Sequence, residues 1–189
     1  MVIFQRPKWN SSASLGELDL SPVKFYGDLL ESLGYLTSLQ SLELNSCNLS
    51  GPIPKSLWNL TRLELLHLSN NYLEGPVPLS LGYLTSLQSL QLNSCNLTGP
   101  IAKSLWNLTR IESMDLRNNH LEGPIPPFTS GQQNLNTLLL SNNSLNGALP
   151  SWISSLPSLS ALDLSFNHFS AQLEDFNYNI LVEINLEHN

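Results

Sequence analysis

The stretch LTSLQSLELNSCNLSGPIPKSLWN at residues 36–59 returns as LTSLQSLQLNSCNLTGPIAKSLWN at residues 84–107, with three changes in 24 positions. Around it, residues 33–80 match residues 81–128 at 36 of 48 positions, which indicates a tandem duplication of two smaller units. Self-similarity at a fixed period is typical of proteins built from stacked structural units. We therefore expect the chain to be a stack of similar turns.

Leucine-type residues with the spacing LxxLxL set the smaller period, which is 24 residues. Each group predicts a strand of about three residues whose side chains alternate between core and surface. Such short strands should pair in parallel with their copies and bury a continuous column of leucines. We divide the chain into an irregular N-terminal segment, 1–14, and an array over 15–189. The repeats of this array begin at residues 15, 39, 63, 87, 111, 135 and 159, with a truncated one at 181.

The residues after each strand also recur. An inward-pointing amide can satisfy the backbone groups that are exposed where a chain leaves a strand, and a cysteine fits the same place as a small buried residue. Gly75 and its equivalents indicate a left-handed or crowded backbone, and Pro78 and its equivalents indicate a turn on the far side. The position three residues after the last leucine holds Asn71, Asn119, Asn143, Asn167 and Asn189, or Cys47 and Cys95.

The segments NLSGPIPKSLWNLT, 48–61, and NHLEGPIP, 119–126, resemble the plant-specific leucine-rich repeat LxxLxxLxLxxNxLxGxIPxxLGxL. The resemblance implies an α/β-type repeat solenoid wound as a right-handed coil. It places a short parallel β-sheet on the concave face and irregular, 3-10 or short helical turns on the convex face. Some turns depart from the pattern, because Val23 occupies the asparagine position of the first repeat and Ala171 the glycine position of the seventh.

The wording of NLTRIESMDLRNNHLEGPIP, 107–126, is further similar to nightshade receptor-like proteins that act in pathogen resistance. That resemblance implies a ligand- and protein-binding segment of a plant cell-surface receptor-like protein in pathogen recognition and defence signalling. The segment would lie on the extracellular side of the plasma membrane and bind a protein or peptide ligand, with a co-receptor as a second partner. A secreted polygalacturonase-inhibitor-like protein, a receptor-kinase ectodomain fragment and a nonfunctional truncated gene product remain alternatives.

Composition narrows the classes of partner. The net charge is −7 and the eight basic residues are scattered, whereas nucleic-acid binding requires a basic stripe. The sequence contains neither the apolar run of a signal peptide nor about 18 consecutive apolar residues for a transmembrane helix. We expect no membrane contact by this segment, and the last repeat stops at Asn189 in mid-turn, which favours a fragment of a longer ectodomain.

The two cysteines are expected to be free. Cys47 and Cys95 occupy equivalent positions two turns apart, about 10 Å at the spacing of stacked strands. A disulfide requires Cα atoms within about 7 Å. We therefore predict two buried thiols.

Signals for catalysis are weak. The sequence has no GxSxG, HExxH or P-loop motif. His67 is interpreted as a solvated, repeat-variable residue, and Asp115 and Asp163 share a column because of the repeat. We predict no enzyme activity, no cofactor and no metal site. Three tryptophans near matching outer positions are expected to pack between neighbouring turns, with a sugar-stacking platform as the alternative: Trp58, Trp106 and Trp152.

The sequence contains six N-glycosylation sequons. Two of them, Asn59 and Asn107, fall on the outer connecting segments, where a glycan is tolerated. Asn10 lies before the array. The predicted glycosylation sites within the array are Asn48, Asn59, Asn96, Asn107 and Asn142.

The polar residues between the leucines should face the concave side in columns. The duplicated copies differ there, and Leu65 and Leu139 are expected to be solvent-facing apolar anchors with Arg117 as a polar contact. Drift on an idle surface is the alternative. The predicted ligand-binding residues are Leu65, His67, Gln91, Asp115, Arg117, Leu139 and Asp163.

Overall fold

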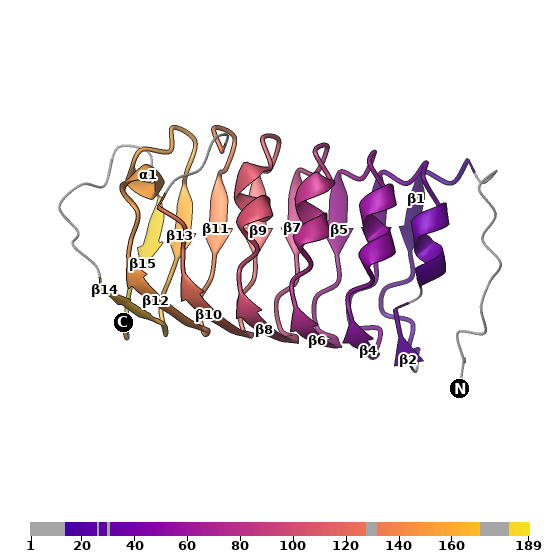
Figure 1. The fold of residues 1–189 in the computed structure, drawn as a ribbon, viewed down its shortest axis with the longest axis horizontal. Helices are drawn as coiled ribbons and strands as arrows, with labels where there is room; N and C mark the ends of the chain where they lie inside the picture. The colour runs from indigo at the N-terminus through magenta and orange to yellow at the C-terminus, as the bar shows by residue number, and fades with distance from the viewer. Residues whose placement is uncertain (1–13, 26, 30, 128–131, 171–181) are drawn as a thin grey trace.

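The computed structural model describes residues 14–25, 27–29, 31–127, 132–170 and 182–189. Within them the chain winds as an elongated coil, and successive turns contribute strands to two parallel sheets (Figure 1). The predicted leucine-rich-repeat fold is confirmed. Sheet A comprises β1 (Glu17–Asp19), β3 (Ser41–Glu43), β5 (Leu65–His67), β7 (Ser89–Gln91), β9 (Ser113–Asp115), β11 (Thr137–Leu139), β13 (Ala161–Asp163) and β15 (Glu183–Asn185), in that order.

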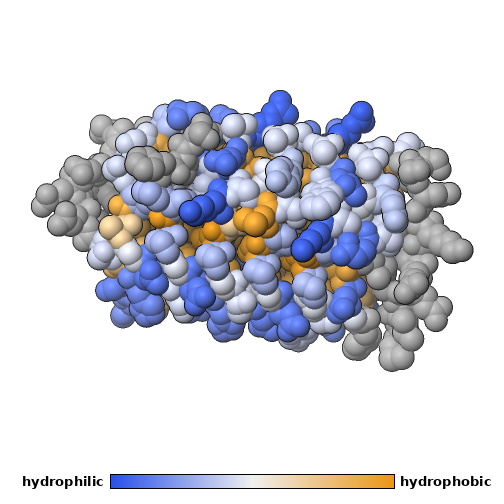
Figure 2. All heavy atoms as spheres, viewed as in Figure 1, coloured by the Kyte–Doolittle hydropathy of each residue, from blue (hydrophilic) through white to orange (hydrophobic). Residues whose placement is uncertain are grey.

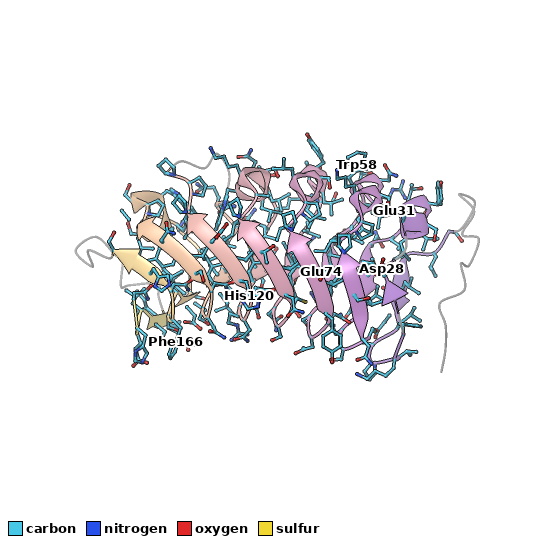
Figure 3. The ribbon with its side chains drawn as sticks, turned by 60° about the horizontal axis from the view of Figure 1, so that its bottom comes forward. Asp28, Glu31, Trp58, Glu74, His120 and Phe166 are labelled. Carbon is cyan, nitrogen blue, oxygen red and sulfur yellow. The ribbon has the colours of Figure 1, made fainter. Side chains whose placement is uncertain are left out.

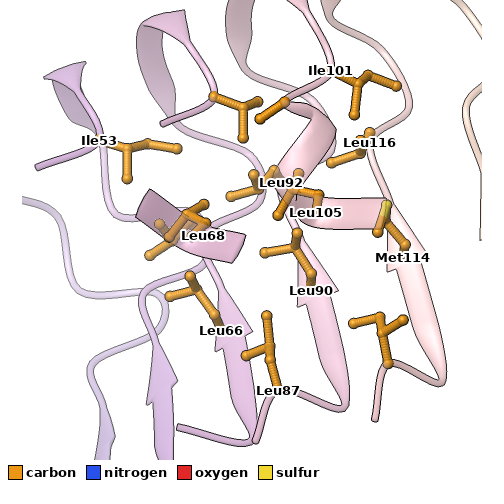
Figure 4. Packing of buried hydrophobic residues seen from close by; sticks show 14 of the residues in the cluster. Ile53, Leu66, Leu68, Leu87, Leu90, Leu92, Ile101, Leu105, Met114 and Leu116 are labelled. Carbon is orange, nitrogen blue, oxygen red and sulfur yellow. The ribbon is translucent and has the colours of Figure 1, made fainter. Parts of the chain in front are cut away.

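The register of sheet A follows the sequence period. Leu42 on β3 pairs with Leu66 on β5, which pairs with Leu90 on β7, so equivalent leucines stack along the coil. All three are fully buried. Figure 4 shows how the leucines behind the strands interleave with those of the opposite side, where Ile101 and Leu105 close the core. Burial of these columns is the main stabilising term of the fold.

A second parallel sheet, sheet B, was not predicted. It is built from the short stretches that contain the repeated Gly-Pro pair, and its strands run along the lower edge of the view in Figure 1. Gly75 has φ +77° there, which an L side chain rarely adopts. In order, sheet B comprises β14 (His168–Ser170), β12 (Ser144–Ala148), β10 (His120–Pro124), β8 (Asn96–Pro100), β6 (Tyr72–Pro76), β4 (Leu49–Pro52) and β2 (Gly27–Asp28).

The asparagines between the two sheets act as predicted. Asn71 Oδ1 accepts hydrogen bonds from the N–H groups of Cys47 and Leu49, both at 3.0 Å, in the preceding turn. Its Nδ2 donates to the carbonyls of Leu44 and Leu68, both at 2.8 Å. Asn71 is 4% exposed, so these backbone groups have little access to water and the side chain substitutes for it.

The third side of the coil carries short helices. Pro78 directly precedes η3 and Pro150 precedes α1, in agreement with their predicted place in a turn. In Figure 1 the helices spread more widely than the strands behind them, which places sheet A on the concave side of the coil. The helices are η1 (Glu31–Tyr35), η2 (Lys55–Asn59), η3 (Leu79–Tyr83), η4 (Lys103–Asn107) and α1 (Ser151–Ser154).

The helices η1 to η4 are arranged in two close pairs. A Cβ on Gly34 of η1 would press on Ser56 of η2, whose hydroxyl donates to the Glu31 carbonyl at 2.7 Å. Gly82 and Ser104 repeat this contact between η3 and η4. The doubled 48-residue period of the sequence therefore corresponds to a pair of helices.

The prediction for the tryptophans is correct for two of them. Trp106 is 1% exposed and meets Trp152 edge-to-face, with ring centroids 5.5 Å apart at 62°. Trp58 occupies the same position one doubled unit earlier but is 44% exposed. The neighbouring turns differ, so identical residues end in different environments.

Both cysteines are free and buried, as predicted. The Cys47 thiol donates to the carbonyls of Leu20 and Asn45, both at 3.4 Å. Burial raises the pKa of each thiol above its ordinary value. The N-terminal segment up to residue 13, the sequon at Asn10, the departure at Ala171 and the repeat start at residue 181 lie outside the described residues.

Candidate functional site

The outward side of sheet A gathers the residues predicted to bind a ligand. We define the concave face as the first and third residues of each of its eight strands, together with the residue two positions after each strand. The middle residue of each strand points into the core, as the alternation of burial shows. All seven predicted residues belong to this face, on the consecutive strands β5 to β13 or, for Arg117, just after β9.

The concave face holds most of the net charge of the protein. Seven carboxylates and one guanidinium give it a formal charge of −6, out of −7 for the whole chain. The strands β5 and β7, near the middle of the sheet, carry no carboxylate, so the acidic groups lie toward both ends. The acidic residues are Glu17, Asp19, Glu43, Asp115, Asp163, Glu183 and Glu187.

A chain of polar contacts crosses three neighbouring strands. His67 Nδ1 lies 3.5 Å from Glu43 Oε2, and His67 Nε2 lies 2.9 Å from Ser89 Oγ. The prediction of a solvated His67 was wrong, because its side chain is 15% exposed and partnered on both sides. Ser89 was missed as a site residue, although the register of the repeat places it on the strand next to His67.

The order carboxylate, histidine and serine resembles that of a serine hydrolase, but the backbone around it differs. Acyl transfer requires N–H groups that are free to stabilise an oxyanion beside the serine. The N–H groups of Gln88 and Ser89 both donate to the Glu64 carbonyl, at 2.8 and 3.0 Å, as part of the sheet. These amides cannot serve as oxyanion donors, so the arrangement fits a binding element.

Asp115 and Arg117 form a two-point ion pair at the end of β9. Arg117 Nε donates to Asp115 Oδ1 at 3.0 Å and Nη2 donates to Oδ2 at 2.7 Å. Asp115 is 8% exposed, so the expectation that it faces solvent was wrong. The pair raises the pKa of Arg117, chiefly through the hydrogen bond from its own side chain to Asp115. The guanidinium is therefore held in place as a fixed polar contact.

The predicted apolar anchors are less exposed than expected. Leu65 and Leu139 are both half-buried, because side chains on the neighbouring strands cover part of them. They lie on β5 and β11 and flank the polar strands β7 and β9. The serines that follow three strands are buried rather than solvent-facing: Ser69, Ser141 and Ser165.

The remaining predicted residues are also half-buried. Gln91 lies on β7 beside His67. Asp163 on β13 accepts hydrogen bonds from the Ser165 hydroxyl at 2.7 Å and the Ser165 N–H at 3.1 Å. Asp163 is thereby fixed in orientation while part of it faces the solvent.

An aromatic stack at the end of the face had no signal in the sequence. Phe166 stacks on His188 with ring centroids 4.5 Å apart, and it is 51% exposed. Its φ is +54°, a conformation that the equivalent Asn142 also adopts, at +55°. Asparagine tolerates this region far better than phenylalanine does.

The predicted glycosylation sites lie on several surfaces. Asn59 and Asn107 end η2 and η4, and both are exposed. Asn96 begins β8 on sheet B and is exposed, whereas Asn48 is half-buried. Asn142 is exposed and donates a hydrogen bond to Asn118 Oδ1 at 2.9 Å. Figure 3 separates the helical edge, marked by Glu31 and Trp58, from sheet B, marked by Glu74 and His120.

Two further features were searched for among the described residues. No helix in that part of the chain is long and apolar enough to span a bilayer. Within the same ranges, no three His, Cys, Asp or Glu side chains are grouped so that they could hold a metal ion.

Comparison with known proteins places the chain among plant receptor ectodomains in structure. The ectodomain of the receptor kinase GASSHO1/SCHENGEN3 from Arabidopsis thaliana, solved with CASPARIAN STRIP INTEGRITY FACTOR 2, is 32% identical with a TM-score of 0.77, over 83% of this chain and 19% of that one. The ectodomain of the Arabidopsis receptor kinase HAESA, solved with an extended IDA peptide hormone, is 32% identical with a TM-score of 0.75, over 90% of this chain and 33% of that one. A second HAESA structure contains IDA and the co-receptor SERK1.

The chain thus spans about a fifth to a third of the length of these two ectodomains. A pollen receptor kinase 3 structure is nearer in size, with 32% identity, a TM-score of 0.65, and coverage of 76% of this chain and 67% of that one. No match is found among curated proteins. Profiles described as leucine-rich repeats match residues 38–60, 62–84, 86–108, 110–131 and 126–169. The chain belongs to the leucine-rich-repeat family.

Proposed function

We propose that the concave face binds a cationic peptide or a cationic segment of a protein. The observation that carries this proposal is the concentration of charge, since six of the seven net negative charges of the chain lie on this one face. Opposite charge on a ligand speeds its encounter with such a surface and selects against acidic competitors.

The arrangement of the strands suits an extended ligand. Eight strands at about 4.8 Å spacing span roughly 34 Å, the length of about ten residues of extended chain. Leu65 and Leu139 offer apolar contacts on either side of the polar strands β7 and β9. Carboxylates toward the ends, such as Glu17 and Glu183, are exposed and available to basic side chains.

The biological setting follows from the relatives and from the wording of the repeats. GASSHO1/SCHENGEN3 and HAESA are membrane receptor kinases that were solved with their ligands, and HAESA was also solved with a co-receptor. We infer that this chain is a segment of a plant cell-surface receptor ectodomain on the extracellular side of the membrane. The resemblance to nightshade receptor-like proteins supports a role in pathogen recognition and defence signalling, with binding rather than catalysis as the activity.

Selection from a displayed library of random peptides about ten residues long tests the proposal. We expect the enriched peptides to carry net positive charge and their affinity to fall steeply as salt is raised from 50 to about 300 mM. Enrichment of neutral or acidic peptides would overturn the cationic ligand.

Paired charge variants then locate the site. Removing two exposed carboxylates from the concave face, with Glu17→Gln and Glu183→Gln, should weaken binding of the selected peptide several-fold. The matched control removes two exposed carboxylates from sheet B, with Glu74→Gln and Glu122→Gln, and should leave the affinity unchanged. Equal effects of the two pairs would show that only the overall charge matters and would refute a site on sheet A.

A further inference from the structure

The helical side of the coil exposes an apolar cluster that the proposed ligand site does not use. Tyr35 is 59% exposed, Trp58 44%, Leu79 68% and Tyr83 67%. They belong to three successive helices, η1, η2 and η3. Figure 2 shows an apolar band running lengthwise along this side of the molecule. Contiguous exposed apolar residues indicate that something covers them.

The close pairing of the helices places each tyrosine next to a sequon. Tyr35 is the last residue of η1 and Asn59 is the last residue of η2, 24 residues later. Because Gly34 lets η1 pack directly on Ser56 of η2, these two residues are neighbours in one row. The second helix pair repeats the arrangement with Tyr83 and Asn107, which end η3 and η4.

We propose that N-linked glycans on Asn59 and Asn107 lie across the rings of Tyr35 and Tyr83, respectively. In the attachment step, Asn Nδ2 bonds to C1 of the first N-acetylglucosamine of a lipid-linked oligosaccharide. The bond from C1 to the pyrophosphate oxygen breaks, the lipid pyrophosphate leaves, and the amide proton passes to a base of the transferase. The acceptor motif is complete at both positions, since each asparagine is followed by Leu and Thr.

The chemistry of the sugar matches that of the surface. One face of an N-acetylglucosamine ring presents C–H groups, which pack on the negative face of an aromatic ring, while its hydroxyl groups stay in water. A glycan in this position covers part of the apolar cluster and remains on a different side of the coil from sheet A. The proposal is independent of the ligand assigned to the concave face.

The full chain, secreted from a eukaryotic cell with an added leader, tests both parts of the proposal. Peptide mapping by mass spectrometry should find Asn59 and Asn107 glycosylated. With Asn107→Gln present, the proton resonances of the first N-acetylglucosamine on Asn59 should show an upfield ring-current shift in a sample with labelled sugar. The shift should disappear in Tyr35→Ser and persist in Tyr83→Ser, which serves as the matched control.

With Asn59→Gln in place of Asn107→Gln, the roles of the two tyrosines should exchange. Both tyrosines are more than half exposed, so these substitutions spare the core, and the melting temperature checks that each variant folds. An unmodified Asn59 would overturn the proposal. So would a glycan on Asn59 whose resonances are unshifted or are the same in Tyr35→Ser, and in that case the cluster belongs to another partner.

Discussion

Asn119 Oδ1 accepts a hydrogen bond from the N–H of Leu97 at 3.0 Å, although the two residues are 22 positions apart. The Asn119 Nδ2 donates at the same time to the carbonyl of Leu92 at 2.9 Å in the preceding turn and to that of Leu116 at 3.1 Å in its own. One side chain thus joins the backbones of two turns, and a column of such asparagines holds the coil together between its two sheets.

Asn119→Ala should therefore destabilise the protein far more than a typical polar substitution. It leaves one N–H and two carbonyls buried without these partners, and each such group costs about 1–3 kcal/mol. We expect the free energy of unfolding to fall by roughly 3–5 kcal/mol, measured by urea titration. Asn146→Ala, at an exposed position on sheet B, is the control and should change it by less than about 0.5 kcal/mol.

Asn119→Cys distinguishes the contribution of hydrogen bonding from that of size. Cys95 occupies the equivalent position one turn earlier, with its thiol 3.6 Å from the Leu68 carbonyl. The cysteine variant should lose clearly less stability than the alanine variant. Equal losses would mean that the thiol at this position contributes only by filling space.

Gly82→Ala should separate the close helix pair η3 and η4. An added Cβ would lie 2.6 Å from the carbonyl carbon of Ser104, where only a shift of the backbone can relieve the overlap. The comparison is Gly75→Ala, which has φ +77° but no atom within 4 Å of the added Cβ. We expect Gly82→Ala to lower the melting temperature more than Gly75→Ala, whose cost of about 1–2 kcal/mol is backbone strain alone. The reverse order would show that the helix pair is not tightly packed.

The raised pKa values of the two thiols predict a dependence of stability on pH. Burial keeps Cys47 and Cys95 protonated in the folded state, whereas in the unfolded chain a thiol deprotonates near pH 8.5. The unfolded state is therefore favoured as the pH rises above about 8.5, and this contribution to stability is complete below that pH. A thiol reagent at pH 8 should react with both cysteines only as fast as the protein opens. Rapid labelling of the native protein would contradict their burial.

Arg117→Gln should destabilise the protein by leaving Asp115 buried without its cation. The guanidinium side chain is 38% exposed, so solvent screens the pair and the loss should be about 1–2 kcal/mol, below that of a fully buried ion pair. Adding Asp115→Asn should recover part of the loss. A double-mutant cycle measures the coupling, and strictly additive losses would show that the two side chains do not interact.

The sequence predicted the parts of the fold that depend on local pattern. The spacing of Leu42, Leu66 and Leu90 predicted sheet A and its register, and the position of Asn71 predicted a buried amide. Sheet B escaped prediction because Gly75 and Pro76 lie in β6 and both residue types are depleted in strands. Stacking of neighbouring turns forms that sheet, and no single repeat contains a signal for it.

Side-chain environments on the surface were harder to predict. The residues of the concave face were assigned correctly from alternation, but the burial of Asp115 depends on how Arg117 folds back over it. Likewise, Trp58 and Trp106 have identical local sequences and opposite exposure, because the turn that follows each one differs. Such differences arise from contacts between repeats, which the pattern within one repeat does not specify.

The pairing of helices in twos also restricts how a gene of this kind can gain or lose copies. Unequal recombination that removes 48 residues preserves the alternation of a glycine-bearing helix with a serine-bearing one. Loss of a single turn, such as residues 60–83, would bring η2 directly against η4 and put Trp58 where Gly82 now meets Ser104. An overlap that already excludes a methyl group would then have to accommodate an indole. Viable descendants of such an array should therefore differ in length by an even number of turns.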